Sequence, residues 1–452
     1  MMGQQVDQGS LFYDFSLDRH VPADNLLRSI DRFVDLSELR RDLTPFYSLL
    51  GRPSIDPELM IRMLIVGYCY GVRSERRLCE EVHLNLAYRW FCRLGLDGDV
   101  PDHSTFSKNR HGRFRDSDLL RKVFETVVRR CMAEGLVGGD GFAVDASLIR
   151  ADANKQRSAE GSEEVDWEAL AATRRSVREY LDTLDEAAWG GASETKPKFV
   201  SRSDPAAQWT GALKGHAFFA YADNYLIDLK AAIIVDVEPT RAIRQAEVGA
   251  ARTMIDRVQD RFGLHPERLA ADSAYGSAGM LAWLVHECGI EPHIPVFDKS
   301  ARTDGTFARE DFTYDYHRDV YLCPAGKMLT CKGTLVNDGA TLLYRASKHD
   351  CDPCGLKPRC CPNAPARKVP RSIHEGARDL ARNSARTDAY VTSRRERKKV
   401  EMLFAHLKRI LRLDRLRLRG PNGARDEFLL AAATQNLRKL AKLIPMPQLQ
   451  PA

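Results

Sequence analysis

The chain has 452 residues and a formal net charge of +6, with 44% hydrophobic and 29% charged residues. This length allows two or three domains with a sizeable core, and the composition is that of an ordinary globular protein rather than a disordered or fibrous one. No apolar segment follows the opening Met-Met-Gly-Gln-Gln-Val-Asp, and the apolar stretch 59–70 is interrupted by Arg62 and too short to cross a bilayer. We therefore expect a cytoplasmic protein, neither secreted nor embedded in a membrane.

Helical periodicity covers residues 24–136. Asp56-Pro57 is typical of a helix start, and Asp102 or Ser104 is a second candidate N-cap. These signals predict a compact helical N-terminal domain, residues 1–136. A glycine-rich joint at 135–141 then separates it from a second domain, residues 137–445.

The second domain has strand-like segments followed by helices, which predicts an α/β fold. A hairpin is expected to turn at Asp223-Asn224 between two of these strands. A polar insertion at about 151–205 contains a charged segment, 163–187, that we predict to be one helix. The expected strands are 142–145, 216–222, 226–235, 268–272 and 292–297, with a helix at 277–288 before the last of them.

Three acidic residues occur in contexts that suit a two-metal phosphoryl-transfer centre. Asp145 and Asp272 each follow a short apolar run of strand type and precede small residues, so a metal ion could reach each carboxylate at a strand end. Glu401 lies in a basic segment that we expect to be a helix packed on the sheet. Carboxylate oxygens suit magnesium, and two such ions about 4 Å apart can activate a hydroxyl and stabilise the leaving oxygen.

The segment around Glu401 has an amphipathic pattern. At 100° per residue, an apolar stripe of Val400, Phe404, Leu407 and Leu411 is bordered by Glu401, which lies at the edge of the buried face. Residues 394–419 hold eleven Lys or Arg against three acids, a distribution that attracts a polyanion. The alternatives are a solvated basic helix face, surface carboxylates without a role, and Asp152 or Asp236 as the true strand-end acids.

A second insertion, residues 300–370, is rich in cysteine. Cys351 and Cys354 form a Cys-x-x-Cys pair, and a structural zinc ion held by four thiolates would stiffen a subdomain with little core. Because the chain is expected in the cytoplasm, its cysteines are more plausible as thiols or metal ligands than as disulfides. The alternative is that they simply pack. The expected zinc ligands are Cys323, Cys351, Cys354 and one of the adjacent pair Cys360 and Cys361, with Cys360 preferred.

The chain resembles the DDE transposases of bacterial insertion sequences, whose catalytic domain is ribonuclease-H-like. Two passages carrying the likeness are Ala143–Ser147 and Ala271–Gly276, each centred on an aspartate. The third is the helix, where Arg397, Glu401 and Lys408 match the family's Tyr-x2-Arg-x3-Glu-x6-Lys spacing and Arg394 stands in place of the tyrosine. The N-terminal passages 27–35 and 101–107 are also similar to the helical region that precedes these catalytic domains.

The resemblance implies an α/β, ribonuclease-H-like catalytic core with an all-helical N-terminal domain for DNA binding or pairing and a Cys-rich insertion. It implies metal-dependent cleavage at the element's terminal inverted repeats and joining to target DNA, at the nucleoid and by at least a dimer. Two Mg²⁺ or Mn²⁺ ions would be held by Asp145, Asp272 and Glu401. The implied DNA contacts are Arg397, Lys398, Lys408, Arg409 and Arg412. The alternatives are a catalytically silent DNA-binding regulator and a metal-dependent nuclease that does not join strands.

Overall fold

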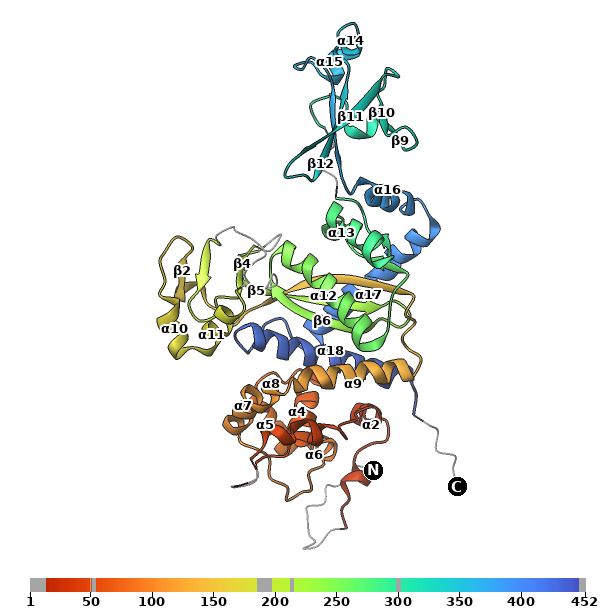
Figure 1. Ribbon diagram of the computed structural model, residues 1–452. Coiled ribbons are helices and arrows are strands. Elements are labelled where there is room, and N and C mark those ends of the chain that lie inside the picture. Colours follow the sequence, from red (N-terminus) through yellow and green to blue (C-terminus); the bar gives the residue numbers. More distant parts are fainter. Residues whose placement is uncertain are drawn as a thin grey trace, which may run out of the picture. The chain divides into compact units, whose positions relative to one another are not determined.

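A computed structural model describes residues 14–48, 50, 54–184, 197–211, 215–297 and 302–446 (Figure 1). The chain divides into two compact units. Unit 1 comprises Met1–Gly139, Val144–His265 and Lys398–Ala452, and unit 2 comprises Asp140–Ala143 and Pro266–Arg397.

The N-terminal part of unit 1 is helical, as predicted. Asp56 caps α4 by accepting the Glu58 N–H at 2.9 Å, with Pro57 in the first helical position, where its missing N–H costs nothing. Asp102, rather than Ser104, caps α7. The helices are α1 (Leu17–His20), α2 (Leu26–Asp31), α3 (Leu39–Leu43), η1 (Thr44–Phe46), α4 (Pro57–Cys69), α5 (Glu75–Leu84), α6 (Leu86–Phe91), α7 (His103–His111), α8 (Arg113–Asp116) and α9 (Leu119–Ala133).

These helices share a core with the C-terminal helix α18 (Pro421–Leu443), which packs against α2, α4, α9 and β6 (Ile233–Arg241) (Figure 1). One buried carboxylate, Glu427, fixes this packing. It pairs with Arg73 and accepts the backbone N–H groups of Arg417 and Leu418, both at 2.6 Å. The helical region is therefore an integral part of unit 1.

A six-stranded sheet follows the helical region, and the α/β prediction is confirmed. Its order is β4-β5-β1-β7-β8, with β6 pairing β5 beside β4. β1, β7 and β8 are parallel, whereas β5 is antiparallel to both β4 and β6. The strands are β1 (Gly141–Arg150), β4 (Gln208–Thr210), β5 (Phe218–Asp228), β7 (Arg268–Ala270) and β8 (Glu291–His293).

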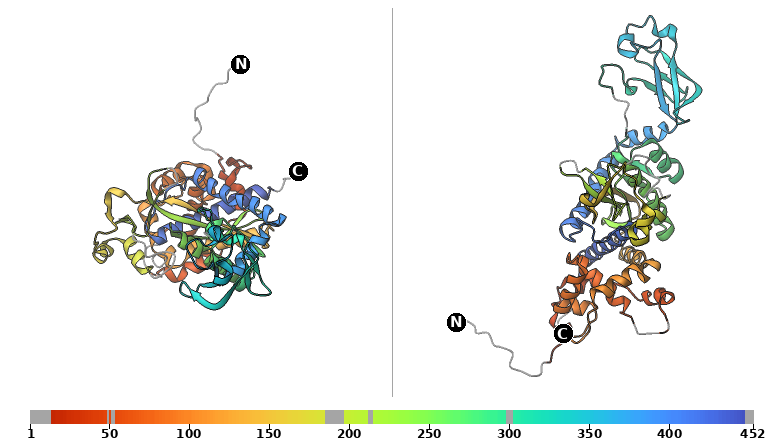
Figure 2. Two further views of the ribbon diagram at one scale, coloured as in Figure 1. Left: turned by 90° about the horizontal axis from the view of Figure 1, so that it is seen from above. Right: turned by 90° about the vertical axis from the view of Figure 1, so that its left-hand side faces the viewer.

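The remaining helices and one short strand pair complete the fold, and Figure 2 shows the fold from two further sides. These remaining elements are η2 (Lys155–Arg157), the pair β2 (Ser158–Glu160) and β3 (Phe199–Ser201), α10 (Trp167–Thr173), α11 (Arg175–Asp182), α12 (Arg244–Phe262), η3 (Ser273–Tyr275), α13 (Ala278–Ala282), the π-helix η4 (Trp283–Cys288), α16 (Glu375–Ser384) and α17 (Asp388–Arg409).

Two local predictions were wrong. The hairpin does not turn at Asp223-Asn224, because β5 continues through both residues to Asp228 and the turn comes at 229–232. The Asn224 amide donates to the Glu238 carbonyl at 2.8 Å, so a turn-type residue is satisfied inside the ladder. The charged segment 163–187 forms the separate helices α10 and α11, because Arg174 is extended between them; residues 185–187 lie outside the described part of the chain.

The insertion in unit 2 contains a five-stranded antiparallel sheet that the sequence analysis did not predict. Its order is β13-β12-β11-β10-β9, and an apolar core that includes Phe312, Tyr321, Leu329 and Tyr344 lies on one of its faces. The insertion therefore has more core than its cysteine content suggested. Its elements are η5 (Arg309–Asp311), β9 (Thr313–Asp315), β10 (Val320–Leu322), β11 (Met328–Val336), β12 (Thr341–Ala346), α14 (Lys348–Cys351), α15 (Lys357–Cys360) and β13 (Lys368–Ser372).

A buried acid in unit 1 predicts that stability depends on pH. The Tyr221 hydroxyl donates to Asp204 Oδ1 at 2.5 Å, and burial raises the pKa of Asp204 to about 7. Because the folded protein holds this proton more tightly than the unfolded chain, the stabilisation is full below about pH 4 and is lost as pH rises through about 7. We expect this carboxyl to contribute at most about 4 kcal/mol to that loss.

Urea unfolding at pH 5 and pH 8 measures the effect. Asp204→Asn should flatten the pH dependence, whereas Asp182→Asn at an exposed position of α11 should leave it as in the wild type. Identical pH profiles for wild type and Asp204→Asn would contradict this prediction.

Candidate active site

The first two candidate acids are related by the register of β1 and β7. These parallel strands pair Gly141 with Arg268, Phe142 with Leu269 and Ala143 with Ala270. Asp145 follows Ala143 by two residues, and Asp272 follows Ala270 by two residues. Each acid thus has the same offset from one paired position on adjacent strands, and each carboxylate is half-buried.

Asp145 does not end its strand, as the sequence had suggested, because β1 continues to Arg150. The continuation is held by a bridge in which the Leu416 N–H donates to the Arg150 carbonyl at 2.7 Å. Before Asp145 the strand is wholly buried, residues 145–148 are half-buried, and Ile149 is buried again. Asp145 therefore lies at the start of a partly exposed stretch of β1.

Asp272 lies just beyond β7 and caps a tight turn. Its Oδ1 accepts the Ala274 N–H at 2.7 Å, which fixes one carboxylate oxygen at the start of η3. Gly276 closes this turn, where a Cβ would lie 2.0 Å from the Pro295 carbonyl oxygen, so no larger residue fits. The sequence Asp-Ser-Ala-Tyr-Gly is thus explained by a tight turn after β7 that lies against residues 295–297.

Glu401 is exposed on α17, next to the buried stripe that the sequence predicted. Val400, Phe404 and Leu407 are all buried, and the Phe404 ring stacks on Tyr225 of β5 with 4.7 Å between centroids. From α18, the Gln435 amide donates to the Leu403 carbonyl at 2.8 Å. The segment of α17 that bears Glu401 is therefore packed against both the sheet and α18.

The predicted DNA-contacting residues differ in exposure. Lys398, Arg409 and Arg412 are exposed, whereas Arg397 and Lys408 are half-buried. Burial lowers the pKa of Lys408, and the Asp223 carboxyl acts in the opposite direction. Three of the five side chains are thus open to a polyanion, while Lys408 has a buried acidic neighbour.

Asp223 is a polar residue that the sequence analysis misassigned to a turn. It is fully buried on β5, and burial raises its pKa well above the ordinary value, although Tyr225 and Lys408 act to lower it. Burial therefore disfavours the charged form of this carboxyl, which is the form that binds a metal ion. The strand pattern was the available signal, since apolar residues flank the pair Asp223-Asn224 on both sides.

The two alternative acids are engaged in ion pairs. Asp236 is buried and pairs with Arg121 and with Arg257, the latter at 3.1 Å. Asp152 pairs with Arg415 and Arg419, both at 2.8 Å. These partners give both carboxylates structural roles in the fold.

Neither the three candidate acids nor the candidate zinc-binding cysteines are arranged as metal ligands in the structure. Within the residues that the structure describes, no group of three or more His, Cys, Asp or Glu side chains is arranged to hold a metal ion. The donor chemistry nevertheless fits, because Asp145, Asp272 and Glu401 offer the hard oxygen atoms that Mg²⁺ or Mn²⁺ takes.

Five of the six cysteines of the insertion, all except Cys354, belong to the core of its sheet or pack against it. Cys323 Sγ accepts the Lys327 N–H at 3.3 Å, and the Cys354 N–H donates to the Cys351 carbonyl at 3.2 Å, which makes the Cys-x-x-Cys segment a turn. Burial raises the pKa of Cys360 to about 11. Burial also raises the pKa of Cys361, and the neighbouring Cys351 thiol adds to that shift.

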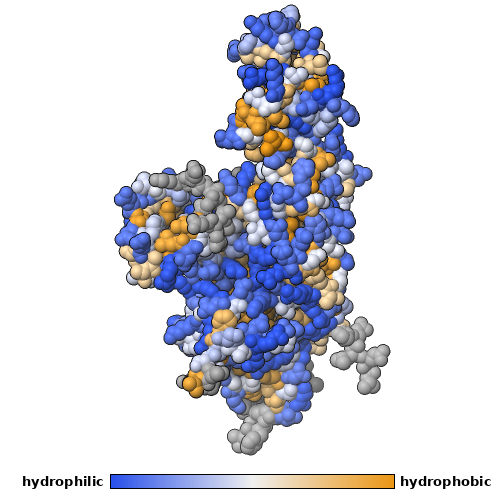
Figure 3. All heavy atoms as spheres, viewed as in Figure 1, coloured by the Kyte–Doolittle hydropathy of each residue, from blue (hydrophilic) through white to orange (hydrophobic). Residues whose placement is uncertain are grey.

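Hydrophilic residues predominate on the side of the molecule shown in Figure 3. No helix among the described residues is long and apolar enough to cross a membrane.

The fold and site together describe an α/β protein with a helical N-terminal region and acids at equivalent offsets on parallel strands. Two family models match this chain. The model described as "Transposase domain (DUF772)" matches residues 15–112, and the model described as "Transposase DDE domain" matches residues 322–441. These two matches support a DDE transposase of an insertion sequence. The second match includes Glu401 and the basic residues of α17, whereas Asp145 and Asp272 lie between the two matched regions.

Proposed function

We propose that this transposase cuts DNA at the ends of its mobile element and joins the freed 3'-hydroxyl groups to target DNA. Asp145, Asp272 and Glu401 are the proposed catalytic acids. The observation that carries the proposal is the β1–β7 register, in which Asp145 and Asp272 have equal offsets from the pair Ala143 and Ala270.

The sheet supports a ribonuclease-H-like catalytic core. A long antiparallel pair, β5 and β6, lies on one side of β1, and the parallel strands β7 and β8 lie on the other. α17 follows the sheet in sequence, and its buried stripe contacts β5 through the Phe404 and Tyr225 rings. This is the arrangement that the family resemblance leads us to expect for the aspartates and the glutamate-bearing helix.

Two divalent cations, Mg²⁺ or Mn²⁺, would be held by Asp145, Asp272 and Glu401, and when bound they would supply Lewis-acid activation of the attacking and leaving oxygens. The protein's own contribution is to fix the acids. The Ala274 N–H orients Asp272, and the packing of Phe404 and Gln435 orients the turn of α17 that bears Glu401. A carboxylate that is already fixed loses little freedom when it binds its ligand.

Basic residues of α17 and of the segment that follows it would position the DNA. The exposed side chains of Lys398, Arg409 and Arg412 are available to phosphate oxygens, and Arg397 and Lys408 lie on the same helix as Glu401. Lys and Arg neutralise phosphates without reading sequence, so these contacts would set the strand's path past the acids.

The proposed partner is double-stranded DNA, both as terminal inverted repeats and as target. Residues 1–136 would recognise or pair the ends, residues 137–445 would carry out the chemistry, and a homodimer would hold two ends together. Deleting 1–136 is a poor test, because it would strip α18 of the helices that cover it and leave Glu427 without Arg73. Point substitutions are needed instead.

The test is a reaction of the purified protein with a labelled duplex that carries the element's ends, in Mg²⁺ or in EDTA, with unlabelled plasmid as target. Cleavage in Mg²⁺ together with labelled plasmid products would support the proposal. Cleavage without joining would replace it with a nuclease, and specific binding of the ends without cleavage would replace it with a silent regulator.

We also propose a structural zinc ion in the insertion, bound by Cys323, Cys351, Cys354 and either Cys360 or Cys361. The Lys327 N–H at the Cys323 sulfur would stabilise a thiolate, and the closeness of the Cys351 and Cys361 thiols favours Cys361 as the fourth ligand. A bound cation would offset the raised pKa of Cys360 or Cys361, because metal binding releases the proton of a ligating thiol.

Metal analysis of the purified protein should then find one zinc per chain, and Cys351→Ser should lower that content at least about tenfold and reduce thermal stability. Cys69→Ser, at a buried position in α4, should leave the zinc content unchanged. A zinc-free wild-type protein with the same stability in chelator would contradict the proposal.

A further inference from the structure

The sheet of the insertion has one face that its apolar core does not cover. On β11, Leu329 is buried in the core, so its neighbour Thr330 projects from the opposite face. On β12 and β13, Tyr344 and Val369 are buried, and Arg345 and Lys368 are exposed on that same opposite face. The alternation along three strands therefore separates an aromatic side from a basic side.

Strand register brings these residues into rows. Thr330 pairs with Arg345, and Arg345 pairs with Lys368, so the three lie side by side across β11, β12 and β13. Lys332 lies two residues further along β11, and it lines the same surface depression as Thr330 and Arg345. We call Thr330, Lys332, Arg345 and Lys368 the basic face.

Arg345 and Lys368 are like charges directly opposite each other, an arrangement that destabilises a sheet. Within the described part of the chain, no acid pairs with Lys332, Arg345 or Lys368. Other arginines of unit 2 are occupied: Arg371 binds Asp379, and Arg367 donates to the carbonyls of Cys360 and Phe307. Folding alone thus does not account for the cations of the basic face.

The basic face is also hollowed. A depression of about 810 Å³ is lined by Thr330, Lys332, Thr334 and Arg345, with Lys327 at its edge. The acid that faces it is Asp350, which lies 3.7 Å from the Lys327 ammonium and offsets that one charge. Lysine, arginine and threonine side chains in a concave surface are the donors that phosphate groups accept.

We propose that the basic face binds the phosphate backbone of duplex DNA without regard to sequence. This inference rests on the proposed function, since an enzyme that cuts and joins DNA must hold the duplex away from its catalytic acids. Cations spaced about 5 Å apart across the strands can meet several phosphates, because duplex DNA carries one charge per ~1.7 Å of its axis. DNA contacts at the basic face can be tested separately from DNA contacts at the catalytic acids, because residues 326–368 contain none of the proposed catalytic residues.

The test compares two variants of equal net charge. The first carries Lys332→Gln, Arg345→Gln and Lys368→Gln, and the control carries Lys230→Gln, Arg359→Gln and Arg386→Gln at exposed positions off the basic face. Fluorescence anisotropy with a labelled duplex of unrelated sequence gives the affinity at several salt concentrations. The single variant Lys332→Gln is measured beside them, in case the triple substitution disturbs the sheet.

We expect the first variant to bind at least about tenfold more weakly at low salt and to lower the slope of log K against log salt by about 2 to 3. Lys332→Gln should lower the slope by about 1, and the control should retain the wild-type slope. Equal loss in both triple variants, or no loss in either, would overturn the inference. Cleavage of the element's ends by wild type, measured separately, decides the proposed function, so either conclusion can fail alone.

Discussion

Glu401→Gln should reduce Mg²⁺-dependent cleavage of the element's ends by at least about 10³-fold, because residues that act as one catalytic unit lose nearly all activity when one is removed. The substitution removes a charge from an exposed position, so it should leave the packing of α17 intact. Binding of the same duplex in EDTA should change by less than about threefold, since carboxylates repel rather than attract phosphates. Gel shift and cleavage of one labelled duplex give both quantities.

A matched control exists on the same helix. Glu396 lies on α17 five residues before Glu401, and its Oε2 is 3.8 Å from Arg268. Glu396→Gln removes the same charge from the same helix and should keep activity within a few-fold of wild type. If both variants lose activity alike, the effect belongs to the helix, and Glu401 is not a catalytic acid. Asp145→Asn and Asp272→Asn should behave as Glu401→Gln does.

Local signals in the sequence predicted much of the fold around this site. The caps at Asp56 and Asp102 depend only on a side chain and the N–H two residues later, so they are readable without tertiary information. The buried stripe of α17 follows from helical spacing, and the structure buries Val400, Phe404 and Leu407 as expected. Such features are short-range, and a sequence carries them directly.

Where burial opposed local preference, burial prevailed. Asp223-Asn224 is a typical turn pair, yet both residues are fully buried inside β5. Asn224 is accommodated because its amide reaches Glu238 and Thr240 on β6, and these partners are known only once the strands are paired. The extension of β1 past Asp145 likewise depends on a bridge from Arg150 to a segment 265 residues away in sequence.

The sheet of the insertion was unpredictable for a related reason. β11 carries Gly333 and a register irregularity between Cys331 and Leu335, which break the alternation that marks a strand. The equal offsets of Asp145 and Asp272 were also invisible, because register is a property of two strands. The sequence could therefore identify the three candidate acids, but the equal offsets of Asp145 and Asp272 become visible only once the two strands are paired.

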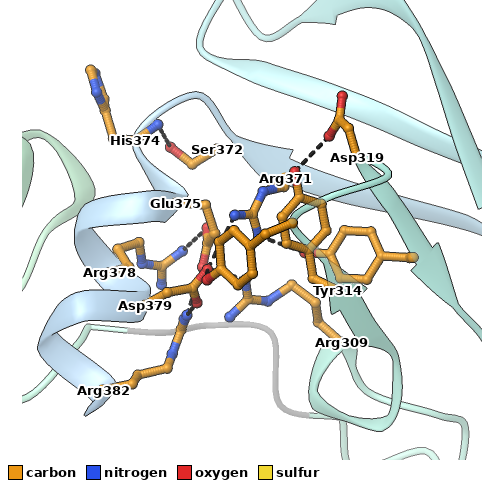
Figure 4. A network of polar contacts seen from close by, with 12 residues as sticks. Arg309, Tyr314, Asp319, Arg371, Ser372, His374, Glu375, Arg378, Asp379 and Arg382 are labelled. Atoms are coloured by element: carbon orange, nitrogen blue, oxygen red, sulfur yellow. Dashed lines mark hydrogen bonds and ion pairs between the residues drawn. The ribbon is translucent and has the colours of Figure 1, made fainter.

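One buried carboxylate in unit 2 holds the insertion's sheet to α16. Glu375 is 1% exposed, and it contacts Arg309 before the sheet as well as Arg378 and Arg382 on its own helix, the last two at 2.9 Å (Figure 4). Beside it, Asp379 accepts from Arg371 of β13 at 3.1 Å. The network thus joins to one helix a residue that precedes the first strand of the sheet and a residue on its last strand.

Glu375→Ala should lower the free energy of unfolding by about 3 to 5 kcal/mol, since it leaves three arginines near a buried site without their shared counter-charge. The exposed Glu310→Ala, next to Arg309, should change it by less than about 0.5 kcal/mol. Urea unfolding measures both. In a double-mutant cycle, Arg309→Ala should recover at least about 1 kcal/mol of the loss, because removing both charges costs less than stranding one. Strict additivity would show that Glu375 acts through its own helix, and the link between α16 and the sheet would then depend on Asp379 and Arg371.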